Sequence, residues 1–382
     1  MERNCYSLNR GDATLWESRT PHAETPRVLF FRALQTMAFE FVPIRASEQP
    51  DLIRFLLKSL RADPAHNSFR PEVIHWKYFA DRPEWTTPRS LAVKQEGQIV
   101  AHGGVWPVRL VTPKTEVQAI HLIDWAASRS AVGAGVSLLR KMTGLADVLL
   151  TIGGSRDTRS LLPKLGYKTC GELRWYARVI RPWLQFRTTP EKNWKTPVKL
   201  LRNLALILTG IPSVPQGWQA TKVTSFTRSE DAALAFPTRS MSPRRTAAGL
   251  NYLLSCPAAR FSGFLVTQAQ QLRGYFLLTQ IGRQVRIVDI RLDGDDRESW
   301  EAICALAARR AAEDPEICEI VAASSIEVTG EAWLRAGLVH RETDQIFCYD
   351  PRSLLSPGPP LDLNLADGDL CILSEPLSPY LS

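Results

Sequence analysis

A run of small residues between a strand-like and a helix-like segment offers a place for an anion. The run is Ser130–Gly135, SAVGAG, and an amphipathic pattern follows it as far as Met142. Free N–H groups at a helix start bind phosphate because the helix dipole is positive there, and glycine lets the backbone approach closely. Isolated Gly-x-Gly matches are common, and the run equally fits a tight strand-to-helix turn. A phosphate site and a simple turn are therefore both open.

The whole chain has a globular composition. Its 382 residues predict two or three domains at about 150 residues each, with 45% apolar and 23% charged residues. Seven cysteines and six histidines are dispersed with no C-x-x-C pair, so we expect no metal site or disulfide framework and a reducing compartment. There is neither a signal-like start nor an apolar run of about 20 residues. We expect a cytoplasmic protein.

Positive charge gathers in one segment. The net charge is +8, and residues 174–203 carry eight basic residues and one acidic residue, with Trp175, Trp183, Phe186 and Trp194 among them. Such a segment suits peripheral contact with acidic lipid headgroups or an anionic substrate, or it is a solvated linker. No nucleic-acid motif accompanies the charge, so nucleic acid is not an expected partner.

Strand-like and helix-like patterns alternate, and their order occurs twice. The first copy runs from Phe39 to Pro182, with strand patterns at 39–46, 90–111, 118–127, 146–154 and 172–180 and helix patterns at 49–62, 132–144 and 157–166. Its long strand pattern predicts a hairpin turning at Glu96-Gly97. The second copy repeats the order at 250–261, 271–280, 285–293, 300–312, 318–325 and 331–341, which indicates a duplication.

The duplication predicts the domain organisation. It aligns Asp289 with Asp124, but acidic residues follow Asp289 at the next helix start and would repel a phosphate. Any phosphate site is therefore expected in the first copy alone. The predicted parts are a loosely held extension (1–36), a first domain (37–182), a basic aromatic linker (183–220), a second domain (221–351) and an acidic Pro-rich tail (352–382).

With this order and the GAG…KLGY pattern, the first copy resembles the GNAT superfamily of N-acetyltransferases. The superfamily loop Gln/Arg-x-x-Gly-x-Gly/Ala aligns with SAVGAG, where Ser130 replaces the first residue. The later pattern Asn-x-x-Ala-x-x-x-Tyr-x-x-x-Gly-Phe places Ser155 at Asn, Leu162 at Tyr and Gly166-Tyr167 at Gly-Phe. The resemblance implies tandem α/β GNAT-like domains, each a mixed, mostly antiparallel sheet with helices on both faces.

The resemblance also implies an acyl-CoA site, with acetyl-CoA first among the donors and no metal. A bulged strand would offer the backbone of Trp125, Ala126 and Ala127 to the thioester and pantetheine arm. The remaining implied contacts lie around the pyrophosphate or follow the next strand: Arg129, Ser130, Val132, Gly133, Ala134, Gly135 and Ser155.

Acyl transfer to an amine needs a proton acceptor and a leaving thiolate. Asp124, at the strand end, is the first candidate base and His121 the second; the alternatives are a structural carboxylate and a core histidine. Leu162 stands where many relatives have the Tyr that protonates the thiolate. Another acid, an unassisted thiolate and a copy without chemistry therefore stay open. Trp76, Tyr78 and Trp85 line an acceptor pocket or belong to the core.

Three functions follow from the resemblance. The first is an acyl-CoA-dependent N-acyltransferase acting on a small-molecule or glycan-precursor amine, such as an amino sugar or cell-surface precursor. The second is an inactive GNAT-like binding or scaffold protein of an envelope polysaccharide pathway, since WKYF at 76–79 is similar to GNAT-like proteins found with bacterial surface-polysaccharide genes. The third is an aminoacyl transferase using aminoacyl-tRNA, with the basic segment as its RNA contact.

Overall fold

The structure, a computed structural model, describes residues 39–382 except 113, 191, 193, 195, 235–239, 356–357 and 374–378. The fold below is that of Glu40–Ser382. The extension expected over residues 1–36 lies outside the described residues.

The first repeat is built from strands and helices in the order that the sequence predicts, with one additional helix, α3. Its elements are β1 (Glu40–Pro43), α2 (Gln49–Leu60), α3 (Pro71–Tyr78), β2 (Ser90–Gln95), β3 (Gln98–Val111), β4 (Glu116–Ala127), α4 (Ala134–Met142), β5 (Val148–Ile152), α5 (Arg156–Leu161), the short helix η3 (Leu162–Leu165) and β6 (Lys168–Val179). The predicted hairpin turn is confirmed, with Glu96 and Gly97 at φ +52° and +76° between β2 and β3.

A helical linker and a second repeat follow. Their elements are α6 (Pro182–Thr188), α7 (Thr196–Ile207), β7 (Trp218–Val223), α8 (Asp231–Leu234), β8 (Ser242–Pro243), α9 (Ala247–Leu254), β9 (Arg260–Gln268), β10 (Gln271–Ile281), β11 (Gln284–Leu292), α10 (Arg297–Ala312), β12 (Glu319–Ser324), α11 (Glu327–Arg335) and β13 (Val339–Tyr349). After β13 the chain forms two short helical turns, Leu365–Asp367 and Asp369–Cys371.

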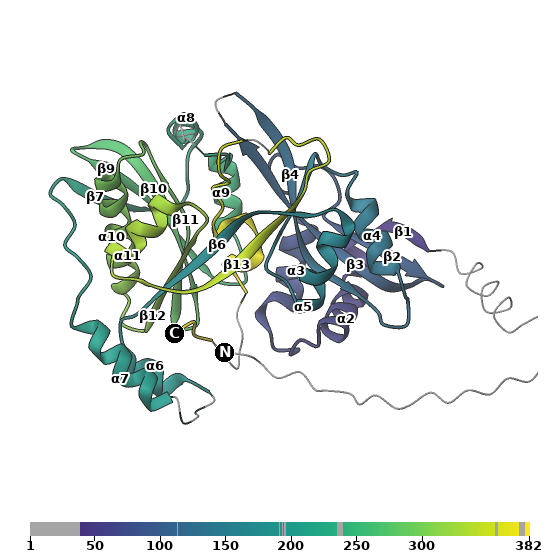
Figure 1. Cartoon of the computed structure of the whole chain (residues 1–382), viewed down its shortest axis with the longest axis horizontal. Helices are drawn as coiled ribbons and strands as arrows, with labels where there is room; N and C mark the ends of the chain where they lie inside the picture. The colour runs from purple at the N-terminus through teal and green to yellow at the C-terminus, as the bar shows by residue number, and fades with distance from the viewer. Residues whose placement is uncertain are drawn as a thin grey trace, which may run out of the picture. The chain divides into compact units, whose positions relative to one another are not determined.

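The described strands form a single sheet of 13 strands. Twelve run in the order β1-β2-β3-β4-β5-β13-β6-β12-β11-β10-β9-β7, and β8 pairs with β3. The repeats exchange their last strands: β13 pairs with β5 and β6, and β6 pairs with β12 (Figure 1). Parallel pairing occurs at β4–β5 and β11–β12, whereas the other pairs of this sheet are antiparallel. The expected mixed, mostly antiparallel sheet with packed helices is therefore present.

The strand that carries Asp124 leaves its neighbour before it ends. β4 and β5 pair only from Ala119↔Val148 to His121↔Leu150, while β4 continues to Ala127. The second repeat shows the same opening, where β11 and β12 pair from Gln284↔Glu319 to Ile287↔Ala322. In each repeat the two parallel strands thus separate, and the end of the first strand has no hydrogen-bonded partner among the described strands on the side of the second.

Residues 361–372, the inner segment, are largely buried, although they lie within the acidic Pro-rich tail that the sequence predicts over 352–382. The Trp106 indole on β3 donates to the Ala366 carbonyl at 3.2 Å, and Arg286 on β11 donates to the Leu370 carbonyl at 2.6 Å. The inner segment therefore joins the two repeats. None of the described helices is long and apolar enough to cross a membrane.

Candidate active site

The two glycines of the SAVGAG run have different structural roles. Gly133 is the N-cap of α4 at φ +86°, a backbone conformation that favours glycine, and a Cβ added there meets no atom within 4 Å. Gly135 lies in the first turn, where an added Cβ would stand 2.9 Å from the Cβ of Ala127. Gly133 therefore shapes the turn, and Gly135 lets α4 pack closely on the end of β4.

The start of α4 has N–H groups available for a ligand. No side chain caps the start of α4, and no described residue accepts a hydrogen bond from the N–H of Gly135 or Val136. The preceding loop faces solvent: Arg129, Ser130, Val132 and Gly133 are exposed. The first turn has no acidic residue. These features suit an anion, because unpaired N–H groups and the helix dipole act together at a helix start.

The corresponding helix of the second repeat has its own cap. The Asp296 carboxylate accepts a hydrogen bond from the Ser299 N–H at 2.8 Å at the start of α10, and Glu298 adds negative charge in the first turn. A phosphate at the start of α10 would face the Asp296 carboxylate, which already occupies that position. The start of α10 is therefore capped by a side chain, whereas the start of α4 is not.

A bulge in β4 turns the strand end toward α4. One residue of β3, between His102 and Gly104, faces two residues of β4, and Asp124 has φ +46°. The His102 ring donates from Nδ1 to the Asp124 carbonyl at 3.1 Å, and the Trp125 indole donates to the Gly135 carbonyl at 3.1 Å. The backbone of 125–127 thus reaches the helix start along the edge of β4 that β5 leaves unpaired.

The Asp124 carboxylate is held by two neighbours from α3. The Lys77 Nζ lies 2.5 Å from Asp124 Oδ2 and 2.8 Å from Asp369 Oδ2, and the Tyr78 hydroxyl donates to Asp124. Burial opposes ionisation, yet the Lys77 charge and the hydrogen bonds outweigh it, so the pKa of Asp124 lies below its usual value. Burial also raises the pKa of Tyr78 well above normal. At neutral pH Asp124 is ionised and Tyr78 protonated.

His121 is fully engaged by backbone groups. Its Nδ1 donates to the Asp367 carbonyl at 2.9 Å, and its Nε2 accepts from the Ile152 N–H at 3.3 Å. Burial lowers its pKa, so the ring is neutral. This histidine joins β4, the end of β5 at Ile152 and the inner segment, and neither nitrogen is left for an amine.

Ser155 and Leu162 belong to the later sequence pattern, and their contacts do not involve Asp124. Ser155 caps α5, its hydroxyl accepting from the Thr158 N–H at 3.2 Å, and it is exposed. Leu162 is fully buried at the start of η3. The position aligned with the Tyr of the GNAT pattern therefore holds a buried apolar side chain.

The second repeat has a related but distinct arrangement around Asp289. Arg245 lies 2.7 Å from Asp289 and 2.7 Å from Asp367, and the Tyr275 hydroxyl donates to Asp289 at 2.8 Å. Asn364 donates to the same carboxylate at 2.7 Å. Each repeat thus buries one aspartate against a cation and a tyrosine, and in each repeat that cation also pairs with an aspartate of the inner segment.

The aromatic residues proposed for an acceptor pocket divide between core and cavity. Trp76 and Tyr78 are buried, and Trp76 stacks on Tyr252 of the second repeat at 4.8 Å between ring centroids. Trp85 and Trp106 line a cavity between the repeats, together with Arg245. Sequence reasoning missed Lys77, because its partner Asp369 lies 292 positions away and nothing local indicates the pair.

No protein-family profile matches the chain, and no curated protein matches its sequence. Solved structures do resemble it. A tandem GNAT protein from the clavulanic acid biosynthesis pathway has 11% identity and a TM-score of 0.53, covering 82% of this chain and 98% of that one. N-myristoyltransferase from Saccharomyces cerevisiae, solved with bound myristoyl-CoA, has 13% identity and a TM-score of 0.55, covering 89% of both chains.

A third similar structure is a GCN5-related N-acetyltransferase from Anabaena variabilis, with 10% identity and a TM-score of 0.54 over 82% of this chain and 73% of that one. At such identities the likeness concerns the fold. The chain therefore has the α/β GNAT fold in tandem.

Proposed function

We propose that the protein is an acyl-CoA-dependent N-acyltransferase that uses the first repeat. The observation that carries the proposal is the uncapped start of α4 beside the unpaired edge of β4. The N–H groups of Gly135 and Val136 would bind the pyrophosphate, with Arg129, Ser130, Val132, Gly133 and Ala134 around it. The backbone of 125–127 would hold the thioester carbonyl and the pantetheine arm.

The buried ion pair defines how protons move in this proposal. An ionised carboxylate with a low pKa is a weak base, so Asp124 acts as a positioning residue that fixes the bulge, and water takes the amine proton. Thiols have a pKa of about 8.5, so coenzyme A leaves as a thiolate without a donor at Leu162. His121 joins strands rather than moving protons.

Acetyl-CoA is the proposed donor, and a longer acyl-CoA is the second choice, since one similar structure contains myristoyl-CoA. The proposed acceptor is an amine on a small molecule or glycan precursor, such as an amino sugar or cell-surface precursor. The WKYF resemblance supports the cell-surface assignment.

Turnover tests the proposal. The purified protein is incubated with acetyl-CoA and a panel of amines, including amino sugars and amino acids. The release of free thiol is measured, and the products are identified by mass spectrometry. We expect amine-dependent thiol release matched by an acetylated product. Thiol release at the same rate without any amine would contradict N-acylation.

An inactive binding protein is the second candidate, and the burial of Leu162 favours it. It predicts acyl-CoA binding with no product from any amine. An aminoacyl transferase is the third, and it predicts product only with charged tRNA, with an affinity that falls steeply with salt.

A further inference from the structure

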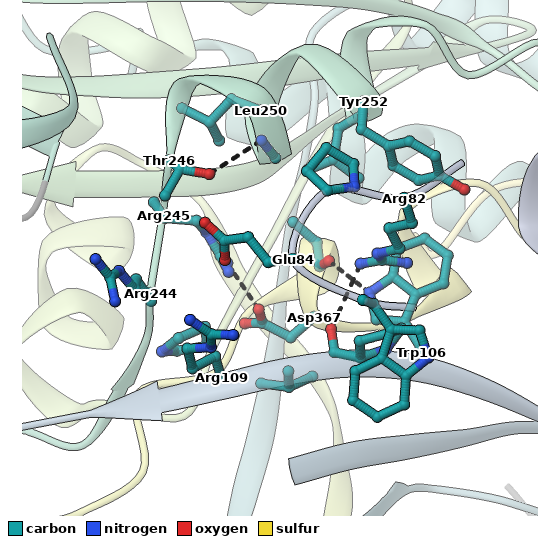
Figure 2. A pocket seen from close by; sticks show the side chains of 18 of the residues that line it. Arg82, Glu84, Trp106, Arg109, Arg244, Arg245, Thr246, Leu250, Tyr252 and Asp367 are labelled. Carbon is teal, nitrogen blue, oxygen red and sulfur yellow. Dashed lines mark hydrogen bonds and ion pairs between the residues drawn. The ribbon is translucent and has the colours of Figure 1, made fainter. Parts of the chain in front are cut away.

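A cavity of about 80 Å³ lies between the two repeats. Its walls come from β3, the loop before β2, the start of α9 and the inner segment, with Trp106, Arg82, Thr246 and Asp367 among the lining side chains (Figure 2). The volume suits one small polyatomic group or a few water molecules.

Two buried donors at this cavity have no hydrogen-bond partner among the described residues. They are Nη1 of Arg82 and the indole Nε1 of Trp85. The Arg82 guanidinium lies 4.3 Å from the centroid of the Trp106 ring and 5.1 Å from that of Tyr252, so the two rings fix its plane (Figure 2). A buried donor without a partner is costly, so two of them at one cavity indicate a ligand with acceptor atoms.

The charge at the cavity also points to an anion. Arg109 and Arg244 share Glu116, and Arg245 is neutralised by Asp289 and Asp367. Arg82 has no ion pair among the described residues, and burial lowers its pKa only to about 10, so it stays charged at neutral pH. Glu84 stands at the rim, exposed and at φ +63°, a strained conformation for this residue.

The geometry points to a subsite for a small oxyanion, a carboxylate or a phosphate ester, bound by Arg82 and the Trp85 indole. This inference rests on the proposed function in one respect: the oxyanion belongs to the amine acceptor. The inner segment supports that link, because Asp367 lines the cavity and Asp369, two residues on, contacts the Lys77 that holds Asp124. The acceptor class is therefore an amine that also carries an acidic group.

The test needs neither acyl-CoA nor turnover, so its failure is distinct from failure of the proposed function. The indole N–H resonance of Trp85 is assigned with Trp85→Phe and followed by NMR while inorganic phosphate or acetate is added. We expect saturable movement of that resonance with at least one of the anions. The preferred anion separates a phosphate ester from a carboxylate.

Three variants sharpen the result. Arg82→Met should abolish the movement, and Glu84→Gln should strengthen binding by removing a competing carboxylate. Arg273→Met is the matched control. The Arg273 guanidinium also lies over an aromatic ring, 6.0 Å from the centroid of Trp218, but neither residue lines the cavity. No movement up to about 10 mM anion, well above a dissociation constant of ~1 mM, would overturn the subsite. Equal movement in Arg82→Met would also overturn it.

A second surface is independent of this cavity. Helix α7 turns apolar side chains outward: Leu201 is 69% exposed, and Leu208 just after the helix is 89% exposed. Its inward contacts are polar, with Asn203 donating to Gln185 at 2.9 Å and Lys199 donating to the Ser382 carbonyl at 3.1 Å. This is the reverse of a helix that packs on a protein core.

Basic and aromatic side chains border the apolar face of α7. Trp183 on α6 is 61% exposed and stacks on Phe186, and Arg187, Lys192 and Arg202 lie nearby in the chain. We infer that α6 and α7 lie on an anionic lipid surface, with the apolar side chains in the headgroup boundary and the cations on lipid phosphates. The exposed basic residues of this surface, Arg187, Lys192, Lys199 and Arg202, favour an anionic lipid over a second copy of the chain.

Co-sedimentation with vesicles tests this surface. We expect binding to vesicles containing phosphatidylserine, weaker binding to phosphatidylcholine alone, and loss of binding in Trp183→Ser with Leu201→Ser. Leu334→Ser, at an exposed leucine of α11, is the matched control. Absence of binding by the unmodified protein overturns the inference, and so does a dimer in solution that the double variant abolishes.

Discussion

The buried Lys77 is the central residue of the first repeat's interior. Its ammonium holds Asp124 from β4 and Asp369 from the inner segment at 2.5 and 2.8 Å, with no exposed side-chain surface. Although burial opposes the charged form, the two carboxylates raise the pKa of Lys77 above its usual value. Removing this cation leaves two carboxylates buried without their partner.

Lys77→Met should therefore destabilise the protein by ~3–5 kcal/mol in denaturant unfolding. Arg54→Met is the comparison, since Arg54 and Asp51 form an exposed pair worth ~1 kcal/mol or less. Equal losses in the two variants would show that the buried network contributes no more than a surface pair.

His102 gives the second prediction at this scale. Burial lowers its pKa to about 4 from an ordinary value of 6.5, and the neutral ring accepts from Ser90 and donates to the Asp124 carbonyl. The unfolded chain binds the proton more tightly, so stability falls as pH drops from 6.5 toward 4, by up to about 3 kcal/mol. Urea unfolding of wild type and His102→Gln from pH 7.5 to 4.5 measures this.

We expect the variant to lose less stability over that range than the wild type. His121 titrates in the same direction and stays in both proteins, so the difference between their slopes reports His102. Parallel slopes would contradict a neutral His102.

At the scale of elements, the close approach of α4 to β4 depends on Gly135. Gly135→Ala should cost about 1–3 kcal/mol, because the new Cβ meets that of Ala127 at 2.9 Å. Gly144→Ala, whose Cβ would lie 3.7 Å from the Lys141 carbonyl, should change stability by less than about 1 kcal/mol. Thermal unfolding of the two variants measures the contrast, and equal melting temperatures would contradict the close approach.

The sequence predicts elements well where one local pattern decides them. Alternating residues and the Glu96-Gly97 turn predict β2 and β3, and the SAVGAG run predicts the start of α4. It does not predict the partners of Asp124, because Lys77 and Asp369 lie 47 residues before and 245 residues after it. The burial of the inner segment was missed because its three aspartates lie within a Pro-rich tail, and only cations from distant parts of the chain make the burial of these aspartates favourable.

At the scale of the whole molecule, the exchange of β6 and β13 ties the repeats together. Repetition in the sequence predicts two copies of one fold, but not which strand completes which sheet, since either last strand fits either neighbour. The hydrophobic core around Trp76 includes Tyr252 and Val321 of the second repeat. Neither repeat is expected to keep its core alone.

Calorimetry should therefore record one cooperative unfolding transition for the chain. Separately expressed halves divided at Gly210 should lack cooperative unfolding and regain it when mixed. Two resolved transitions in the intact chain, or a stably folded half, would contradict the shared sheet.

The central claim is that the start of α4 binds the pyrophosphate of an acyl-CoA. Calorimetric titration of acetyl-CoA into wild type, Gly133→Asn and Gly133→Asp tests it most directly. Both substitutions fit the left-handed conformation and the open space at Gly133, and they differ only in charge. We predict near wild-type affinity for Gly133→Asn and at least about tenfold weaker binding for Gly133→Asp. Equal affinity of the two variants, or no binding of acetyl-CoA or myristoyl-CoA by the wild type, would contradict the claim.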